Sequence, residues 1–159
     1  MDDVTIIRAL HVLSVVLWIG GVGFVTTVLL PAARKLTSSQ ARTEFIAEAE
    51  RRFARQARFM IALAGLTGLY MLVRLDLWER FQAPAYWWLD AMVGVWLLFA
   101  LMLYVVEPLL IHRWLERQTW AGPEAKFGVI IWLHRILLAI SLITLLGAVA
   151  GSHGLLIPV

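Results

Sequence analysis

Residues 9–33 read ALHVLSVVLWIGGVGFVTTVLLPAA, a stretch of 25 residues without Asp, Glu, Lys or Arg. A helix needs about 20 mostly apolar residues to cross the hydrocarbon core of a bilayer. The stretch therefore predicts a transmembrane helix over residues 4–31. Its end is placed at Pro31, because proline lacks the backbone N–H that a continuing helix requires.

The rest of the chain is also rich in apolar residues and poor in charged ones. Apolar residues make up 61% of the whole chain and charged residues 16%, against roughly 45–50% and about 25% in soluble domains. Further apolar runs predict membrane helices over residues 53–75, 86–111 and 127–151, and the polar residues 38–52 predict a surface helix that leads into the second of these. We expect one all-α domain, residues 1–159, forming an up-down-up-down integral membrane four-helix bundle.

Thirteen of the fourteen Lys and Arg residues lie toward the ends of the apolar runs, and these are distributed unevenly between the two sides. Ten of them flank the loops between helices 1 and 2 and between helices 3 and 4: Arg34, Lys35, Arg42, Arg51, Arg52, Arg55, Arg58, Arg113, Arg117 and Lys126. Only Arg8, Arg74 and Arg80 lie on the other side. Because cytoplasmic loops carry the excess of Lys and Arg, both termini are expected outside, in the periplasm, with the protein in the inner membrane of a bacterium.

Charge and cysteine content exclude several classes of function. The net charge of +3 comes from residues at helix ends, so the partner they indicate is the lipid bilayer rather than nucleic acid. The chain has no cysteine, which excludes disulfides, thiolate zinc sites and iron–sulfur clusters. Spacings typical of hydrolases, zinc proteases or nucleotide-binding loops do not occur.

Histidine and methionine remain as metal ligands, and the helix directions sort them by depth. Four fall at one level, near the outer ends of the predicted helices: His11, Met71, Met92 and His153. His11 has the strongest claim, because a histidine in a transmembrane helix is costly and marks a functional site. It shares a helix face with Ser14 and Trp18.

Two arginines and one further histidine complete the candidate set. Arg8 and Arg74 lie close to the level of His11, where guanidinium groups can pair with haem propionates; interfacial anchoring is the simpler role. His134 lies about two turns into the last helix on a face with Ser141 and Ala148. That face suggests the bundle interior, where His134 is either a hydrogen-bonded structural residue or the ligand of a second haem.

The ligand chemistry fits two cofactors. A histidine paired with a histidine or methionine of a neighbouring helix is a common axial pair for haem b in a helix bundle. Small residues give a porphyrin room, and the chain has Gly20, Gly21, Gly65 and Gly68. Imidazole and thioether together also suit Cu(I), although the methionines are too widely spaced for a Met-x-x-Met pair. The residues alone leave haem b and copper open.

Two further features concern helix packing. Glu107 precedes Pro108, which is expected to kink the third helix. Its carboxylate either relays protons or, in the simpler interpretation that we favour, pairs with a base such as Arg58. Gly147-x-x-x-Gly151 permits close helix approach, either within one chain or across a homodimer.

The segment Ala9-Leu-His-Val-Leu-Ser-Val-Val-Leu-Trp-Ile-Gly-Gly21 resembles the first helix of the copper-resistance D (CopD-like) membrane family. It is also similar to the related short haem-binding protoporphyrinogen oxidases of bacteria. The basic run at residues 51–58 and the later Thr67-Gly-Leu resemble their second helix. The resemblance implies that His11 is a haem or metal ligand. Where those oxidases have a lysine early in helix 3, this chain has Trp88-Leu-Asp-Ala-Met, which counts against protoporphyrinogen oxidation.

Three functional hypotheses follow. The first is a b-type haem protein that transfers electrons near the periplasmic face. As a membrane oxidoreductase it would act between a quinone and a partner protein, with His153, Met71 or Met92 as second ligand to His11. The second is a copper transport or tolerance protein that uses the same outer residues. The third is a structural subunit of a membrane complex that binds no metal.

Overall fold

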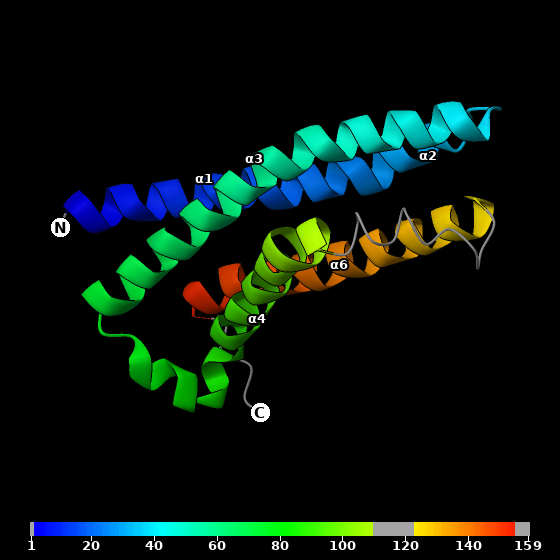
Figure 1. The fold of residues 1–159 in the computed structure, drawn as a ribbon. Coiled ribbons are helices and arrows are strands. Elements are labelled where there is room, and N and C mark those ends of the chain that lie inside the picture. The colour runs from blue at the N-terminus through cyan, green and yellow to red at the C-terminus, as the bar shows by residue number, and fades with distance from the viewer. Residues whose placement is uncertain (1, 110–122, 155–159) are drawn as a thin grey trace.

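The computed structural model describes residues 2–109 and 123–154, and throughout these ranges the regular elements are helices (Figure 1). Four segments are long and apolar enough to cross a membrane: Asp3–Ala33, Gln40–Arg74, Pro84–Leu109 and Phe127–Ser152. The prediction of an all-α protein with four such helices is confirmed. Residues 110–111 of the third predicted helix, and the basic residues Arg113 and Arg117 used for the orientation, lie outside the described residues.

The first span contains a π turn that keeps it helical past its proline. It consists of α1 (Asp2–Phe24), the π turn η1 (Val25–Leu29) and α2 (Leu30–Ala33). The Leu30 N–H donates to the carbonyl of Val25, five residues back. Proline lacks an N–H and its ring clashes with the carbonyl four residues earlier, and the widened turn two residues before Pro31 accommodates both effects. The helix therefore continues to Ala33 instead of ending at Pro31.

The third span repeats this arrangement. Helix α4 (Trp87–Leu101) passes into the π turn η4 (Met102–Val106), which ends two residues before Pro108. The Glu107 N–H donates to the carbonyl of Met102. The disturbance expected at this proline thus takes the form of a π turn just before it, and such turns are frequent at functional sites.

The second span is a single helix that includes the predicted surface segment. Helix α3 (Ser39–Arg74) has 36 residues, and the Ser38 hydroxyl caps it by accepting from the Ala41 N–H at 3.3 Å. The predicted surface helix and the predicted second membrane helix therefore form one continuous helix, residues 39–74, with Ser38 and Leu75 as its caps. The 3-10 turns η2 (Trp78–Gln82) and η3 (Pro84–Tyr86) lead into α4, and α6 (Pro123–Ser152) is the last helix.

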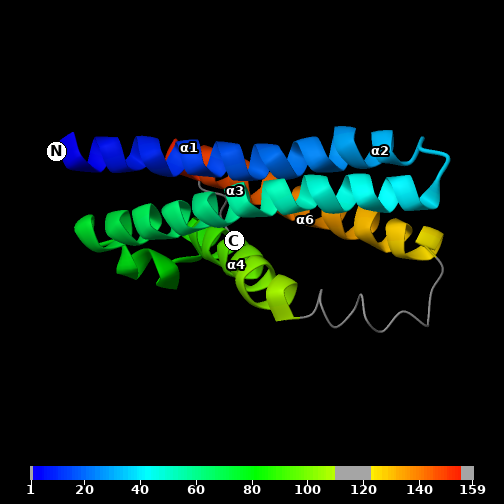
Figure 2. The same cartoon turned by 45° about the horizontal axis from the view of Figure 1, so that its top comes forward.

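Helices α1 and α3 lie side by side over most of their length, and α4 packs on α6 (Figures 1 and 2). All four spans contribute to one buried core: Trp18, Ile19, Val22, Ala57, Ile61, Phe99 and Leu137. The rings of Trp18 and Phe99 meet edge to face with centroids 5.0 Å apart, a geometry that stabilises by about 0.5–1.5 kcal/mol beyond burial. The core thus ties the α1–α3 pair to the other two helices.

Two glycines of α6, Gly147 and Gly151, are in contact with tryptophans of the same chain. A Cβ added at Gly147 would lie 2.5 Å from the Trp87 ring, and one added at Gly151 would lie 2.2 Å from Trp88 Nε1. The Gly-x-x-x-Gly pattern therefore serves packing between α4 and α6. A homodimer through these two glycines stays a prediction.

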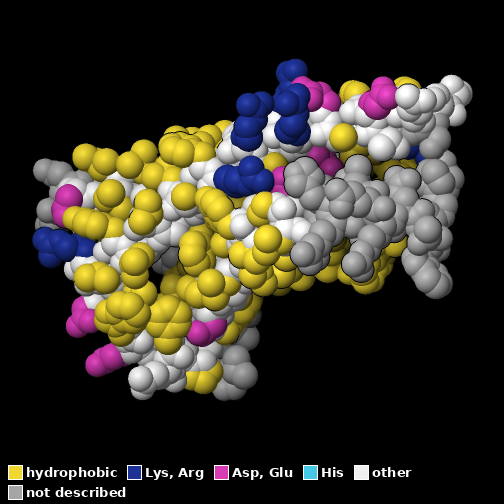
Figure 3. Space-filling model, in the orientation of Figure 1, with side chains coloured by type: hydrophobic (Ala, Val, Ile, Leu, Met, Phe, Trp, Pro, Cys, Tyr) yellow, Lys and Arg dark blue, Asp and Glu magenta, His cyan; other side chains and the backbone are white. Residues whose placement is uncertain are grey.

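Much of the molecular surface is apolar, as Figure 3 shows for one face. Large side chains along the spans are widely exposed, for example Leu146 at 70% and Leu66 at 68%. Contiguous exposed apolar surface of this extent is unusual for a soluble monomer and suits contact with lipid. With its four spans, the chain is a multi-pass membrane protein.

Candidate functional site

His11 lies on α1 and is directed at α3. Its Nδ1 is 3.0 Å from the Ala64 carbonyl oxygen and 3.0 Å from the Thr67 hydroxyl. A carbonyl can only accept a hydrogen bond, so this contact assigns the ring proton to Nδ1. The Thr67 hydroxyl donates to the Leu63 carbonyl at 2.6 Å, which leaves its oxygen to accept from His11. In this tautomer Nε2 carries a lone pair.

The surroundings of His11 fix its position on the helix pair. A Cβ added at Gly68 would lie 3.3 Å from His11 Cε1, so the ring packs directly on the backbone of α3. Ser14 donates to the His11 carbonyl at 2.7 Å. Ser14 and Trp18 are buried and His11 is half-buried. The three residues therefore share the inward face of α1, as helical periodicity predicts.

The other two described histidines are held by their own helix. His134 is half-buried on α6, with Nδ1 2.9 Å from the Ile130 carbonyl oxygen. It lies on the face that carries the buried Ser141, which agrees with the predicted inward direction. His153 follows the end of α6 and is exposed, with Nδ1 2.8 Å from the Val149 carbonyl oxygen. Only His11 among these three bonds to a neighbouring helix.

The predicted outer ligands are divided between two helix pairs. His11 and the half-buried Met71 belong to α1 and α3, whereas the half-buried Met92 lies on α4 and His153 follows α6. Within residues 2–109 and 123–154, no group of three or more His, Asp or Glu side chains can hold a metal ion. A site with three or more protein ligands would therefore have to include a ligand of another kind, such as a methionine, or a residue outside these ranges.

Two of the four glycines expected to make room for a porphyrin are filled from within the chain. A Cβ at Gly21 would lie 2.2 Å from the Phe53 ring, and one at Gly65 would lie 2.5 Å from the Trp96 ring. Gly20 has nothing within 4 Å, and Gly68 adjoins His11. Of the four glycines, only Gly20 therefore has open space beside it, and at nine residues from His11 in α1 it does not adjoin the candidate ligand.

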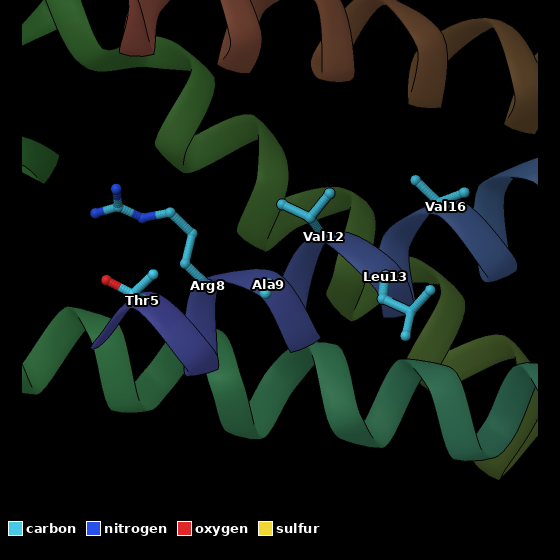
Figure 4. A pocket seen from close by; sticks show the side chains of 6 residues that line it. All are labelled: Thr5, Arg8, Ala9, Val12, Leu13 and Val16. Atoms are coloured by element: carbon cyan, nitrogen blue, oxygen red, sulfur yellow. The ribbon is translucent and has the colours of Figure 1, made fainter. Parts of the chain in front are cut away.

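Arg8 and Arg74, the two arginines predicted near the level of His11, differ in their contacts. Arg74 Nε lies 3.5 Å from Asp3 Oδ2, and the Tyr70 hydroxyl donates to the same oxygen at 2.9 Å. Arg8 is exposed and forms no hydrogen bond or ion pair with the described part of the chain; Figure 4 shows it beside a hollow on α1. Sequence reasoning missed the contact with Asp3, since only the register of α1 on α3 brings Asp3 to Arg74 and to Tyr70, which lies one turn before Arg74 on α3. The pairing of either arginine with propionates stays a prediction.

A second polar group lies toward the opposite end of the bundle. Arg58 Nη2 is 2.8 Å from Glu107 Oε1, and Arg58 Nε donates to the Leu103 carbonyl at 3.2 Å. The Tyr104 hydroxyl donates to the Arg58 carbonyl at 2.7 Å. The ion pair expected between Arg58 and Glu107 is confirmed, and the guanidinium also satisfies a carbonyl of the π turn η4.

Comparison with known proteins gives one finding. A family model described as "Domain of unknown function (DUF4149)" matches residues 13–119, which is 107 of the 159 residues. No curated protein and no solved structure matches the chain. The matched range contains Met71, Met92 and Arg74 but begins just after His11 and ends before His134 and His153.

Proposed function

The chain belongs to the DUF4149 family, and we propose that it is a b-type haem protein of the bacterial inner membrane that transfers electrons near the periplasmic face. His11 would be one of the residues that hold its iron. The observation that carries the proposal is the hydrogen bond from His11 Nδ1 to the Ala64 carbonyl. It leaves Nε2, the nitrogen that a metal would take, without its proton.

This arrangement is the one that metal-binding histidines generally have. Such a residue donates its other ring N–H to a carbonyl or carboxylate, which fixes the tautomer and raises the basicity of the ligand nitrogen. His11 has one such partner on α3, the Ala64 carbonyl, and the Thr67 hydroxyl oxygen is a second acceptor for the same N–H. Since α1 and α3 pack closely at Gly68, the position of the ring is set by helix packing. Haem bound there supplies a one-electron couple, which the chain's own side chains lack.

The orientation that we propose has both termini in the periplasm. Its support is the excess of Lys and Arg in the loops between helices 1 and 2 and between helices 3 and 4. In this orientation His11, near the start of α1, lies in the periplasmic half of the membrane. An electron partner, a quinone or a periplasmic protein, would approach from that side.

Single cysteines test the orientation cleanly, because the chain has none of its own. Thr37 lies before α3 and Gln82 lies before α4, and both are exposed. A membrane-impermeant maleimide should label Gln82→Cys in intact spheroplasts and Thr37→Cys only after permeabilisation. The reverse pattern would put the termini, and His11, on the cytoplasmic side.

The haem proposal is tested by the dithionite-reduced minus oxidised spectrum of protein purified from cells supplied with ample haem precursor. Wild type should give a b-type spectrum, and His11→Ala should lose it. His134→Ala and His153→Ala are the matched controls. Whichever of them also loses the spectrum identifies a second ligand, and if neither does, Met71→Ala and Met92→Ala are compared next.

Thr67→Val separates a ligand role of His11 from a merely structural one. The variant removes one of the two partners of Nδ1 but keeps the Ala64 carbonyl, so haem should still bind, about 10-fold more weakly. A structural role alone would change the melting temperature without changing haem affinity or the midpoint potential.

Two other outcomes would each overturn the proposal. Copper in elemental analysis without a Soret band would identify a copper transport or tolerance protein. Neither metal nor Soret band would identify a structural subunit of a membrane complex. A b-type spectrum that persists in His11→Ala would show that the protein binds haem but that His11 is not a ligand.

A further inference from the structure

The outer end of the α1–α3 pair has two open hollows, each running along one helix to an arginine. The first measures about 530 Å³ and is lined by Thr5, Arg8, Ala9, Val12, Leu13 and Val16 (Figure 4). The second measures about 350 Å³ and is lined by Leu66, Leu69, Tyr70, Val73 and Arg74. Each thus combines an apolar strip with one cation, the chemistry that suits an amphiphile with an anionic head.

The side chain of Arg8 is placed to meet a lipid headgroup. Figure 4 shows its guanidinium extended along α1 toward the N-terminal end, away from Val12 and Val16. Long basic side chains extend in this way from apolar surface to the interface. At 1.5 Å per residue, Val16 lies about 12 Å deeper than Arg8, so the apolar strip follows the path of an acyl chain.

The two arginines differ in whether their charge is already matched. Arg74 lies 3.5 Å from the Asp3 carboxylate, which also accepts from Tyr70. Arg8 has no acidic partner in the described part of the chain. A phosphate therefore complements Arg8, whereas at Arg74 it would have to compete with Asp3.

The hollow beside Arg8 is also distinct from the face of the candidate haem ligand. At about 100° per residue, the direction of Thr5, Val12 and Val16 is roughly 120° around α1 from that of His11. His11 is directed at Ala64 and Thr67 of α3, whereas Val12 and Val16 are 54% and 57% exposed. An occupant of the hollow therefore does not need His11.

We propose that the hollow beside Arg8 binds one anionic phospholipid. Its phosphate pairs with the Arg8 guanidinium, and one acyl chain lies along Ala9, Val12 and Val16. The proposal does not depend on haem, since it rests on a different face of α1 and on a charge that has no acidic partner within residues 2–109 and 123–154.

Native mass spectrometry of the full chain, released from detergent with phosphatidylglycerol or with phosphatidylcholine of the same acyl chains, tests the proposal. A basic residue near the surface favours anionic lipid by about five-fold, so wild type should retain phosphatidylglycerol about five-fold better. Arg8→Gln should abolish this preference. Arg74→Gln, the matched control, should keep it. Ala9→Phe, which fills the hollow at an exposed position, should lower the binding of both lipids.

Equal binding of the two lipids by wild type would show an ordinary lipid-facing surface and overturn the proposal. So would a loss of preference in Arg74→Gln as large as that in Arg8→Gln. Both variants alter exposed side chains, and unchanged Trp fluorescence and melting temperature would confirm that each is folded. The same measurement on haem-free His11→Ala should give the wild-type preference, which separates this test from that of the haem proposal.

Discussion

Arg58→Leu should destabilise the protein by about 2 kcal/mol, and adding Glu107→Leu to it should restore part of that loss. The two side chains form a 2.8 Å ion pair between α3 and α4, and they are only 35% and 28% exposed. Removing one partner leaves the other charge unmatched at the edge of an apolar bundle, which costs more than removing both. The expected loss of about 2 kcal/mol is smaller than the roughly 3–5 kcal/mol lost when one partner of a fully buried pair is removed, because water still reaches both side chains.

A contact with the π turn η4 should increase the loss of stability in Arg58→Leu. Its Nε donates to the Leu103 carbonyl within η4, and the turn that precedes Pro108 depends on such outside partners for the carbonyls that it frees. Arg58→Leu should therefore lower the free energy of unfolding more than Glu107→Gln does, because Glu107→Gln removes the charge but keeps a hydrogen-bonding side chain. Arg58→Lys should fall between them, since it keeps the charge but cannot bond to both partners in the same geometry.

The measurement is a double-mutant cycle, with unfolding in mixed micelles of increasing sodium dodecyl sulfate followed by Trp fluorescence. Arg52→Leu is the control, because its partner Glu48 lies one turn away on the same exposed helix face; it should change the midpoint little. If Arg58→Leu and Glu107→Leu acted additively, the pair would contribute no coupling and this account of the α3–α4 contact would be wrong.

The contrast between the Arg58–Glu107 and Asp3–Arg74 pairs shows how far the sequence predicts such contacts. Glu107 is a carboxylate late in an apolar run, so a basic partner at the same depth could be expected from depth alone. Asp3 and Arg74 are ordinary helix-end charges, and nothing in their sequence neighbourhood indicates that they meet. Their contact depends on the register of α1 on α3, which is set by packing at small residues such as Gly68.

The sequence pattern also fails to predict how the candidate site is assembled and where some helices end. Hydropathy places the four spans, because it depends on composition over about 20 residues. It assigns depth along each helix, but not which helices pair. The ligands predicted at one outer level therefore fall on two helix pairs. The π turns before Pro31 and Pro108 are local responses to proline that apolar patterning does not reveal. The sequence therefore predicts an end of the first helix at Pro31, whereas the helix continues to Ala33.

Alanine should destabilise the protein at Gly151 and be tolerated at Gly20, although both glycines lie within helices. A Cβ at Gly151 would lie 2.2 Å from Trp88 Nε1, whereas one at Gly20 would meet nothing within 4 Å. Trp88 is only 8% exposed, so its ring cannot easily move aside. Overpacking of this kind costs about 1–3 kcal/mol, whereas alanine in place of an unhindered helical glycine stabilises by about 0.5–1 kcal/mol.

Thermal unfolding of the two variants, with Gly147→Ala and Gly94→Ala as a second matched pair, should show opposite shifts. A Cβ added at Gly147 would lie 2.5 Å from the Trp87 ring, whereas one added at Gly94 would meet nothing within 4 Å. The dependence on protein concentration then separates packing within the chain from a dimer. If Gly147 and Gly151 contact Trp87 and Trp88 of the same chain, the loss of stability is the same at every concentration. A loss that appears only at concentrations where the wild type dimerises would instead assign the two glycines to contact between chains.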